Sequence, residues 1–212
     1  MELQYLLGGL GNTLIIWMGS ILFAFVLSVP VAACRRASSP ILRGITRVWV
    51  AIVRGLPPLV WMILLFFGVG IGLLGQSPMF ASIVALGLIN SAYFGDSIYA
   101  GLSSVPTGQW EAIKALALPT RQAYVRVIIP QAFPIIIASS TAYSISLVKN
   151  TAIASIIGAN ELMFYGHNIV QAGANGLQVF FLIGLVYLAL TIPVGMLARW
   201  VEGRSVISTV RR

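Results

Sequence analysis

Few groups in this chain could carry chemistry. Its 212 residues include five acids, one histidine and one cysteine. His167 has no second histidine, cysteine or paired acid at ligand spacing, so the sequence predicts no metal site. No phosphate-binding loop of the Gly-x-x-x-x-Gly-Lys-Ser/Thr type is present, and no nucleophile is paired with a base. We therefore expect no catalytic residue and no cofactor bound by the chain itself.

Two charges inside otherwise apolar stretches are the candidates for solute binding. A carboxylate at the centre of a bilayer costs on the order of 3 kcal/mol, so Asp96 is expected to face protein or water. It either lines a solute path and recognises an ammonium group, or it is a structural acid near the inner boundary. Lys149 either snorkels to the outer interface or, together with Asn150, donates to a solute carboxylate. In the second case a gate segment containing Thr151 and Ser155 follows it.

The elements that position these residues are predicted to be membrane-spanning helices. Hydrophobic residues make up 58% of the chain and charged residues 8%, against about 25% charged residues in a soluble domain. This composition excludes a soluble monomer and a disordered chain. It predicts an all-α integral membrane protein, folded as one transmembrane domain over residues 1–212. Five apolar runs are each long enough to span a bilayer, at about 12–34, 56–75, 79–101, 131–150 and 176–200.

The positive charges predict the orientation of these spans. With the N-terminus outside, the inside segments are 35–55, 102–130 and 200–212. Twelve of the 13 Lys and Arg residues lie in these segments or at their borders, and Lys149 is the exception. Cations concentrate in cytoplasmic loops, so we expect an outside N-terminus and a cytoplasmic C-terminus. The formal net charge of +8 then indicates orientation rather than a nucleic-acid partner.

Two further candidates have plain explanations. Residues 31–34, Val-Ala-Ala-Cys, loosely resemble a lipoprotein cleavage site, but no Lys or Arg precedes them as a signal peptide requires. A spanning helix with an incidental Cys34 is favoured. Beyond the fourth span, Glu161 either contacts an external binding protein or is an exposed loop acid, and His167 is expected to be an ordinary surface residue.

The polar stretch 102–130, between the third and fourth spans, is the most informative segment. It is predicted to form two short helices along the inner membrane face, stopped by Pro119 and Pro130. Ala112, Ala115 and Ala117 are small enough for another surface to approach closely. The residues alone leave two explanations open: a docking element for another protein, or an interfacial helix that only connects two spans.

A family resemblance distinguishes the two. Glu111-Ala112-Ile113, the later Ala117 and the pair Ile129-Pro130 resemble the EAA loop of ABC-transporter permease subunits. Further segments resemble the polar amino acid permeases, which carry histidine, glutamine, arginine or opines: 54–60, 92–96, 104–112 and 150–158. The resemblance covers about residues 11–204, and Pro-x-Gly-Gln-Trp-Glu-Ala at 106–112 is its most specific signal.

The resemblance implies a type I ABC importer permease fold in a bacterial inner membrane, with a cytoplasmic coupling helix between the third and fourth spans. The residues implied to contact the ATPase are Glu111, Ala112, Lys114, Ala115, Ala117 and Leu118. The implied partners are a cytoplasmic ABC ATPase dimer that binds ATP and Mg, a second permease subunit, an extracytoplasmic substrate-binding protein, the lipid bilayer and an amino acid substrate. Asp96, Lys149, Asn150, Thr151 and Ser155 are the implied path or gate residues.

The chain departs from the family pattern at several of these positions. Ala117 replaces the usual glycine, which we expect to raise helix propensity by about 1 kcal/mol while adding a methyl group at the docking surface. Asp96 stands where relatives commonly have Glu, and Asn150 where they often have Asp. Two other functions remain as alternatives: import of a related solute such as an opine or amino-acid derivative, and a channel or ion-coupled carrier. The last predicts repeated halves or charged rings, and the sequence has neither.

Overall fold

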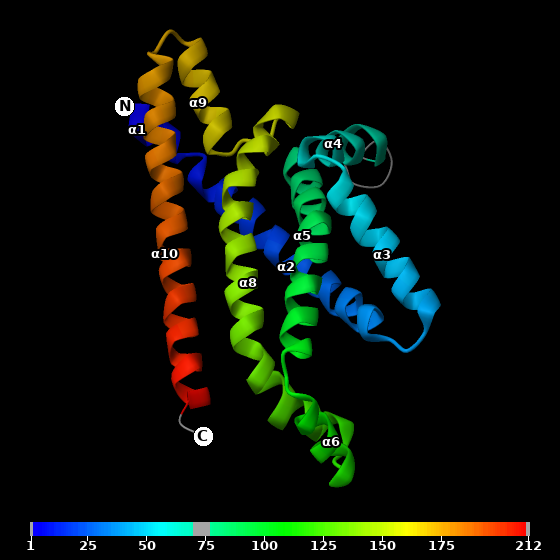
Figure 1. Cartoon of the computed structure of the whole chain (residues 1–212). Coiled ribbons are helices and arrows are strands. Elements are labelled where there is room, and N and C mark those ends of the chain that lie inside the picture. Colours follow the sequence, from blue (N-terminus) through cyan, green and yellow to red (C-terminus); the bar gives the residue numbers. More distant parts are fainter. Residues whose placement is uncertain (1, 70–76, 211–212) are drawn as a thin grey trace.

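The chain folds into a bundle of long helices that carries short helices at both ends (Figure 1). The computed structural model describes residues 2–69 and 77–210. The elements in chain order are α1 (Glu2–Leu7), α2 (Leu10–Arg36), α3 (Pro40–Gly55), α4 (Pro58–Ile63), the π-helical η1 (Leu64–Val69), α5 (Pro78–Ser103), α6 (Thr107–Ala115), α7 (Thr120–Gln122), the π-helical η2 (Ala123–Ile128), α8 (Ile129–Asn150), the 3-10 helix η3 (Thr151–Ile157), α9 (Leu162–Gln171) and α10 (Gly176–Val210). The described residues contain no strand, and the expected all-α fold is confirmed.

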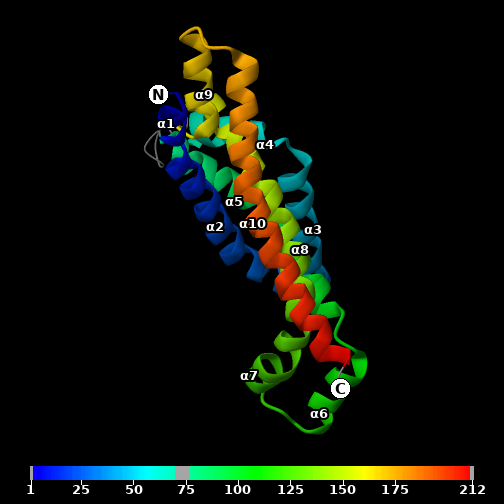
Figure 2. The same ribbon diagram turned by 90° about the vertical axis from the view of Figure 1, so that its left-hand side faces the viewer.

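Four helical stretches in the described ranges are long and apolar enough to cross a bilayer. They are Gln4–Arg36, Pro78–Ser103, Thr120–Ile157 and Gly176–Met196. A fifth crossing is possible through a bent pair, Pro40–Gly55 with Pro58–Gly68. Figures 1 and 2 show α2, α5, α8 and α10 running through the molecule, with α9 at one end and α6 at the other.

Small residues allow α2 and α5 to cross closely. Ser20, Ala24, Ser28 and Ala32 recur every fourth position of α2 and are all buried. On the facing helix, a Cβ atom at Gly95 would lie 2.6 Å from Val31 Cγ1. Close backbone approach through small residues is the usual way in which membrane helices associate, so this pair forms the base on which the other helices pack.

The second predicted span, 56–75, and the predicted inner loop 35–55 need correction. Residues 40–55 form α3 rather than a loop, and α3 meets the following helix at an angle of 96°. The break falls at Leu56, whose extended backbone (φ −100°, ψ 139°) precedes Pro57 and Pro58. A proline disfavours helical geometry in the residue before it. Arg54 therefore lies within the bent pair, one residue before the end of α3, and residues 70–75 of the predicted span fall outside the described ranges.

The predicted stop at Pro130 is also wrong. The backbone stays helical from Thr120 to Ile157, passing through η2 into α8 and on into η3. Pro130 is the second residue of α8, directly after the π-helical η2, and the helical backbone continues through it. The second half of the segment predicted to couple is therefore joined to α8 without a break in helical structure.

Candidate functional site

Helix α6 projects beyond the C-terminal end of α5 and the N-terminal end of α8, at the bottom of Figure 1. Of the six residues implied to contact an ATPase, five have exposed side chains: Glu111, Ala112, Lys114, Ala115 and Ala117. Leu118 is half-buried, and Leu116 beside it is 70% exposed. The structure thus gathers the predicted coupling residues on one short exposed helix and the turn that follows it.

The opposite face of α6 is anchored. Trp110 and Ile113 pack against a small buried cluster formed by Val105, Ile128 and Ala132. The Trp110 ring lies edge-on to Tyr124 of η2, with the ring centroids 5.8 Å apart. The Arg36 guanidinium, at the end of α2, lies over the Trp110 ring, 4.8 Å from its centroid. The Trp110 indole therefore connects α6 to both α2 and the η2–α8 helix.

Ala117 lies in an unexpected conformation. It is outside the helix, in the left-handed region, with φ +46°. The Ala117 and Leu118 N–H groups donate to the Lys114 and Ile113 carbonyls at 3.0 and 3.1 Å, the pattern of a Schellman motif. Two other turns in the described residues have this pattern, and both use glycine: Gly158 (φ +88°) and Gly173 (φ +100°). The expected gain in helix propensity at Ala117 is therefore wrong, because the residue ends the helix.

Replacing Ala117 by glycine is expected to stabilise the turn by roughly 0.5–1 kcal/mol, because left-handed geometry costs an alanine about 1–2 kcal/mol and the more flexible unfolded glycine takes back part of that gain. Thermal unfolding of the purified permease, with amide exchange at Leu116 to Leu118, measures the effect. Ala112→Gly, inside α6, is the matched control and is expected to destabilise by about 1 kcal/mol. Equal loss of stability in both variants would contradict the assignment.

Asp96 is held by two arginines. It pairs with Arg35 at the end of α2 and, at 2.6 Å, with Arg54 near the end of α3. Arg54 also donates to the Ala92 carbonyl at 2.8 Å and lies over the Tyr93 ring at 4.1 Å. The carboxylate thus joins α2, α3 and α5, and the network carries one net positive charge.

The predicted gate residues lie far from Asp96. Thr151 is fully buried and donates to the Val148 carbonyl at 2.7 Å, and Ser155 donates to Ala152 at 2.7 Å. Lys149 is exposed and Asn150 half-buried at the same end of α8. This end lies beside the start of α5, since Pro78 comes within 4.0 Å of a Cβ built on Gly158. Asp96 is 18 residues further along α5, about 27 Å at 1.5 Å per residue, so the structure separates the two groups.

Glu161 is the residue that the sequence misplaced. It is 0% exposed rather than an exposed loop acid. Its carboxylate caps α9 by accepting from the Phe164 N–H at 2.9 Å, and it accepts from the Tyr187 hydroxyl of α10 at 2.7 Å. Burial raises the pKa of the Glu161 carboxyl, and these hydrogen bonds oppose the rise. The sequence signal was an acid directly before an apolar helical run, a cap position.

The backbone around Glu161 is fixed as closely as its side chain. A Cβ atom on Gly9 would lie 2.7 Å from the Glu161 carbonyl carbon and the Leu162 nitrogen. Thr13 accepts from that Leu162 N–H at 3.1 Å. The start of α2, the start of α9 and the middle of α10 are therefore tied together at the end of the molecule opposite α6 (Figure 2).

Known proteins resemble this chain in sequence and in fold. Residues 20–206 match the family described as "Binding-protein-dependent transport system inner membrane component". The chain belongs to this family. It is 32% identical over 208 residues to the nopaline transport system permease protein NocM of Agrobacterium fabrum, covering 92% of this chain and 86% of that protein. It is 30% identical over 187 residues to the L-cystine transport system permease protein TcyL of Bacillus subtilis, covering 85% and 78%.

Solved structures of two transporters have the same fold. A chain of an amino acid ABC transporter crystallised with histidines gives a TM-score of 0.83 at 26% identity, covering 95% of this chain and 94% of that one. A chain of the MetNI methionine ABC transporter, in an inward-facing conformation, gives 0.83 at 23% identity, covering 96% and 97%. The family and the fold expected from the EAA-like loop are both confirmed, and this chain is an ABC importer permease subunit.

Proposed function

We propose that this permease subunit carries a polar amino acid or a close derivative inward, driven by ATP hydrolysis on a separate subunit. The observation that supports the proposal best is the exposed face of α6 around Glu111. This face points away from the bundle because Trp110 anchors the opposite face. A helix presented in this way suits docking into a partner. It also explains how a chain without a phosphate-binding loop is driven by ATP.

In the proposed assembly, transport and ATP hydrolysis are carried out by different subunits. Two permease subunits, identical or similar, enclose the path, and each α6 contacts one subunit of a cytoplasmic ATPase dimer that binds ATP and Mg. A substrate-binding protein delivers the solute on the other side of a bacterial inner membrane. In this proposal the α9 end of the bundle faces outward and the α6 end faces the cytoplasm, in agreement with the charge-based orientation.

The proposed solute class rests on relatives that are named for the solutes they transport. Permeases named for nopaline and L-cystine, and a solved amino acid transporter, resemble this chain over most of its length. Asp96 is assigned as a positioning acid rather than an ammonium site, because Arg35 and Arg54 already neutralise it. Lys149 and Asn150 remain the gate candidates. The Thr151 and Ser155 hydroxyl hydrogens are already donated within the chain.

Reconstitution of the complete transporter in proteoliposomes tests the proposal. The binding protein is loaded in turn with each of the twenty amino acids and with opines, and ATP hydrolysis and uptake are measured together. We expect at least one polar amino acid or opine to stimulate both several-fold. Stimulation by sugars or inorganic ions alone, with none by amino acids or opines, would overturn the solute assignment.

A further inference from the structure

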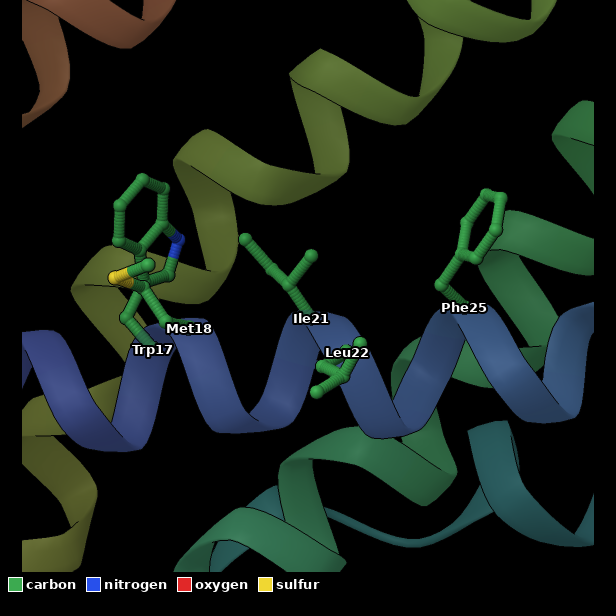
Figure 3. A pocket seen from close by; sticks show the side chains of 5 residues that line it. All are labelled: Trp17, Met18, Ile21, Leu22 and Phe25. Carbon is green, nitrogen blue, oxygen red and sulfur yellow. The ribbon is translucent and has the colours of Figure 1, made fainter.

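A long groove separates α2 from α8 on one side of the bundle. It encloses about 900 Å³, within the usual range of small-molecule sites. Its walls are apolar, with Phe25 and Val29 from α2, Phe94 and Ile98 from α5, and Phe133 and Ile137 from α8. Figure 3 shows a neighbouring pocket on α2, lined by Trp17, Met18 and Leu22 together with Ile21 and Phe25, which it shares with the groove.

The groove lies on the opposite side of α5 from the charged network. Phe94, Ile98 and Leu102 line it and share one face of α5, since they are four residues apart. Asp96 and Tyr93, which contact Arg54, lie on the other face at about 100° per residue. A path for a polar solute needs polar groups along its wall. The wall of the groove is mostly apolar, so the groove is better suited to hydrocarbon than to a polar solute.

The hydroxyl groups in the groove do not make it a polar site. Thr141 donates to the Ile137 carbonyl at 2.8 Å, and Ser144 donates to the Ser140 carbonyl at 2.9 Å. These two hydrogen atoms are used inside α8, and the other polar side chains of the wall are Ser140, Tyr124 and Arg36. The remaining lining is apolar, so most of the groove suits hydrocarbon.

One end of the groove is basic. Arg36 and Ala37, at the end of α2, close it on the α6 side. The Arg36 guanidinium lies over the Trp110 ring, and no hydrogen bond from its N–H groups is found in the described residues. Stacked guanidinium groups keep their N–H edges for phosphate oxygens. Basic pockets between transmembrane helices on the cytoplasmic side are typical sites for anionic headgroups.

The length of the groove also fits a lipid. From Ile21 to Arg36 it follows 15 residues of α2, about 22 Å. Half of a bilayer is roughly 20–22 Å thick when the headgroup region is counted, and about 15 Å of that is hydrocarbon. We propose that the groove binds one anionic phospholipid of the leaflet on the α6 side, with an acyl chain along Phe25, Phe94 and Phe133 and the phosphate on Arg36.

Native mass spectrometry of the purified complete transporter tests the headgroup contact. Detergent-solubilised protein is incubated with phosphatidylglycerol or phosphatidylcholine, and retained lipid is counted. We expect preferential retention of phosphatidylglycerol, reduced about fivefold in Arg36→Gln and reduced less in Arg36→Lys, which keeps the charge but not the stacked guanidinium. Arg121→Gln, at an exposed arginine outside the groove, is the matched control and is expected to retain the lipid. Equal retention by the wild type and Arg36→Gln would overturn the proposal.

A second variant tests the hydrocarbon contact without touching the charge. Ala33 lines the groove, and Ala33→Phe is expected to displace the lipid, whereas Leu188→Phe on the exposed face of α10 is not. Loss of the permease dimer in Ala33→Phe with unchanged lipid retention would show that a second permease subunit fills the groove, and would overturn the proposal. Lipid retention does not depend on transport, so this result and the solute assignment can fail separately.

Discussion

Lysine in place of Glu111 is expected to abolish solute uptake by the assembled transporter while the permease stays folded and inserted. Glu111 is exposed on α6, on the side away from the Trp110 and Ile113 anchor, so the substitution leaves the packing of the helix intact. It reverses a charge at the centre of the proposed docking surface. A like-charge contact in an interface costs several kcal/mol, which corresponds to a loss of at least about hundredfold in productive docking.

Uptake and substrate-stimulated ATP hydrolysis in proteoliposomes measure this effect. Glu111→Gln, which removes the charge without reversing it, is expected to give an intermediate loss. Ser38→Lys adds the same cation at an exposed position between α2 and α3, outside α6, and should leave ATP hydrolysis unchanged. Normal stimulated hydrolysis in the Glu111→Lys transporter would remove α6 from the coupling mechanism.

The second large effect is expected at Asp96. Replacement by asparagine leaves the guanidinium groups of Arg35 and Arg54 converging without a negative charge between them. Removal of one partner from a buried ion pair typically costs 3–5 kcal/mol. Because the three side chains are each about a quarter to a third exposed, we expect a loss near the lower end, about 3 kcal/mol.

Thermal unfolding of the purified permease tests the loss, and the double variant Asp96→Asn with Arg35→Gln is expected to recover part of it. Asp96→Glu, which keeps the charge, should lose less than Asp96→Asn. If Asp96 instead recognised a solute ammonium, Asp96→Asn would leave the unfolding temperature unchanged and reduce uptake alone. That result would return Asp96 to the solute path.

Apolar length was sufficient to predict the long helices, because a spanning segment needs little more than about twenty apolar residues. It failed at α3, where Arg43, Arg47 and Arg54 lower the mean hydropathy. Their spacing of four and seven residues places all three on one helical face. Helical periodicity was therefore the better signal there, and it also explains how these charges are accommodated in a helix.

The site was predicted in part for a similar reason. The residues proposed for coupling follow one another in a short segment, so a local pattern was sufficient to predict that they lie together. The partners of Asp96 and Glu161 are distant in sequence, since Arg35 and Tyr187 lie 61 and 26 residues away. Alanine is the strongest helix former, so nothing local to Ala117 predicts a left-handed turn. Only the glycine expected at that position hinted at it.

The unbroken helix from Thr120 to Ile157 gives the molecule a mechanical lever. Its central α-helical part, α8, has 22 residues and is roughly 33 Å long, with η2 at one end and η3 at the other. A tilt of about 5° at the η2 end moves the η3 end by about 3 Å. The π turn at η2 also sets the rotational phase between the two ends, since one residue added to or removed from a helix rotates everything beyond it by about 100°. In the proposed mechanism, a push on α6 thus arrives at the η3 end as a displacement with a defined direction.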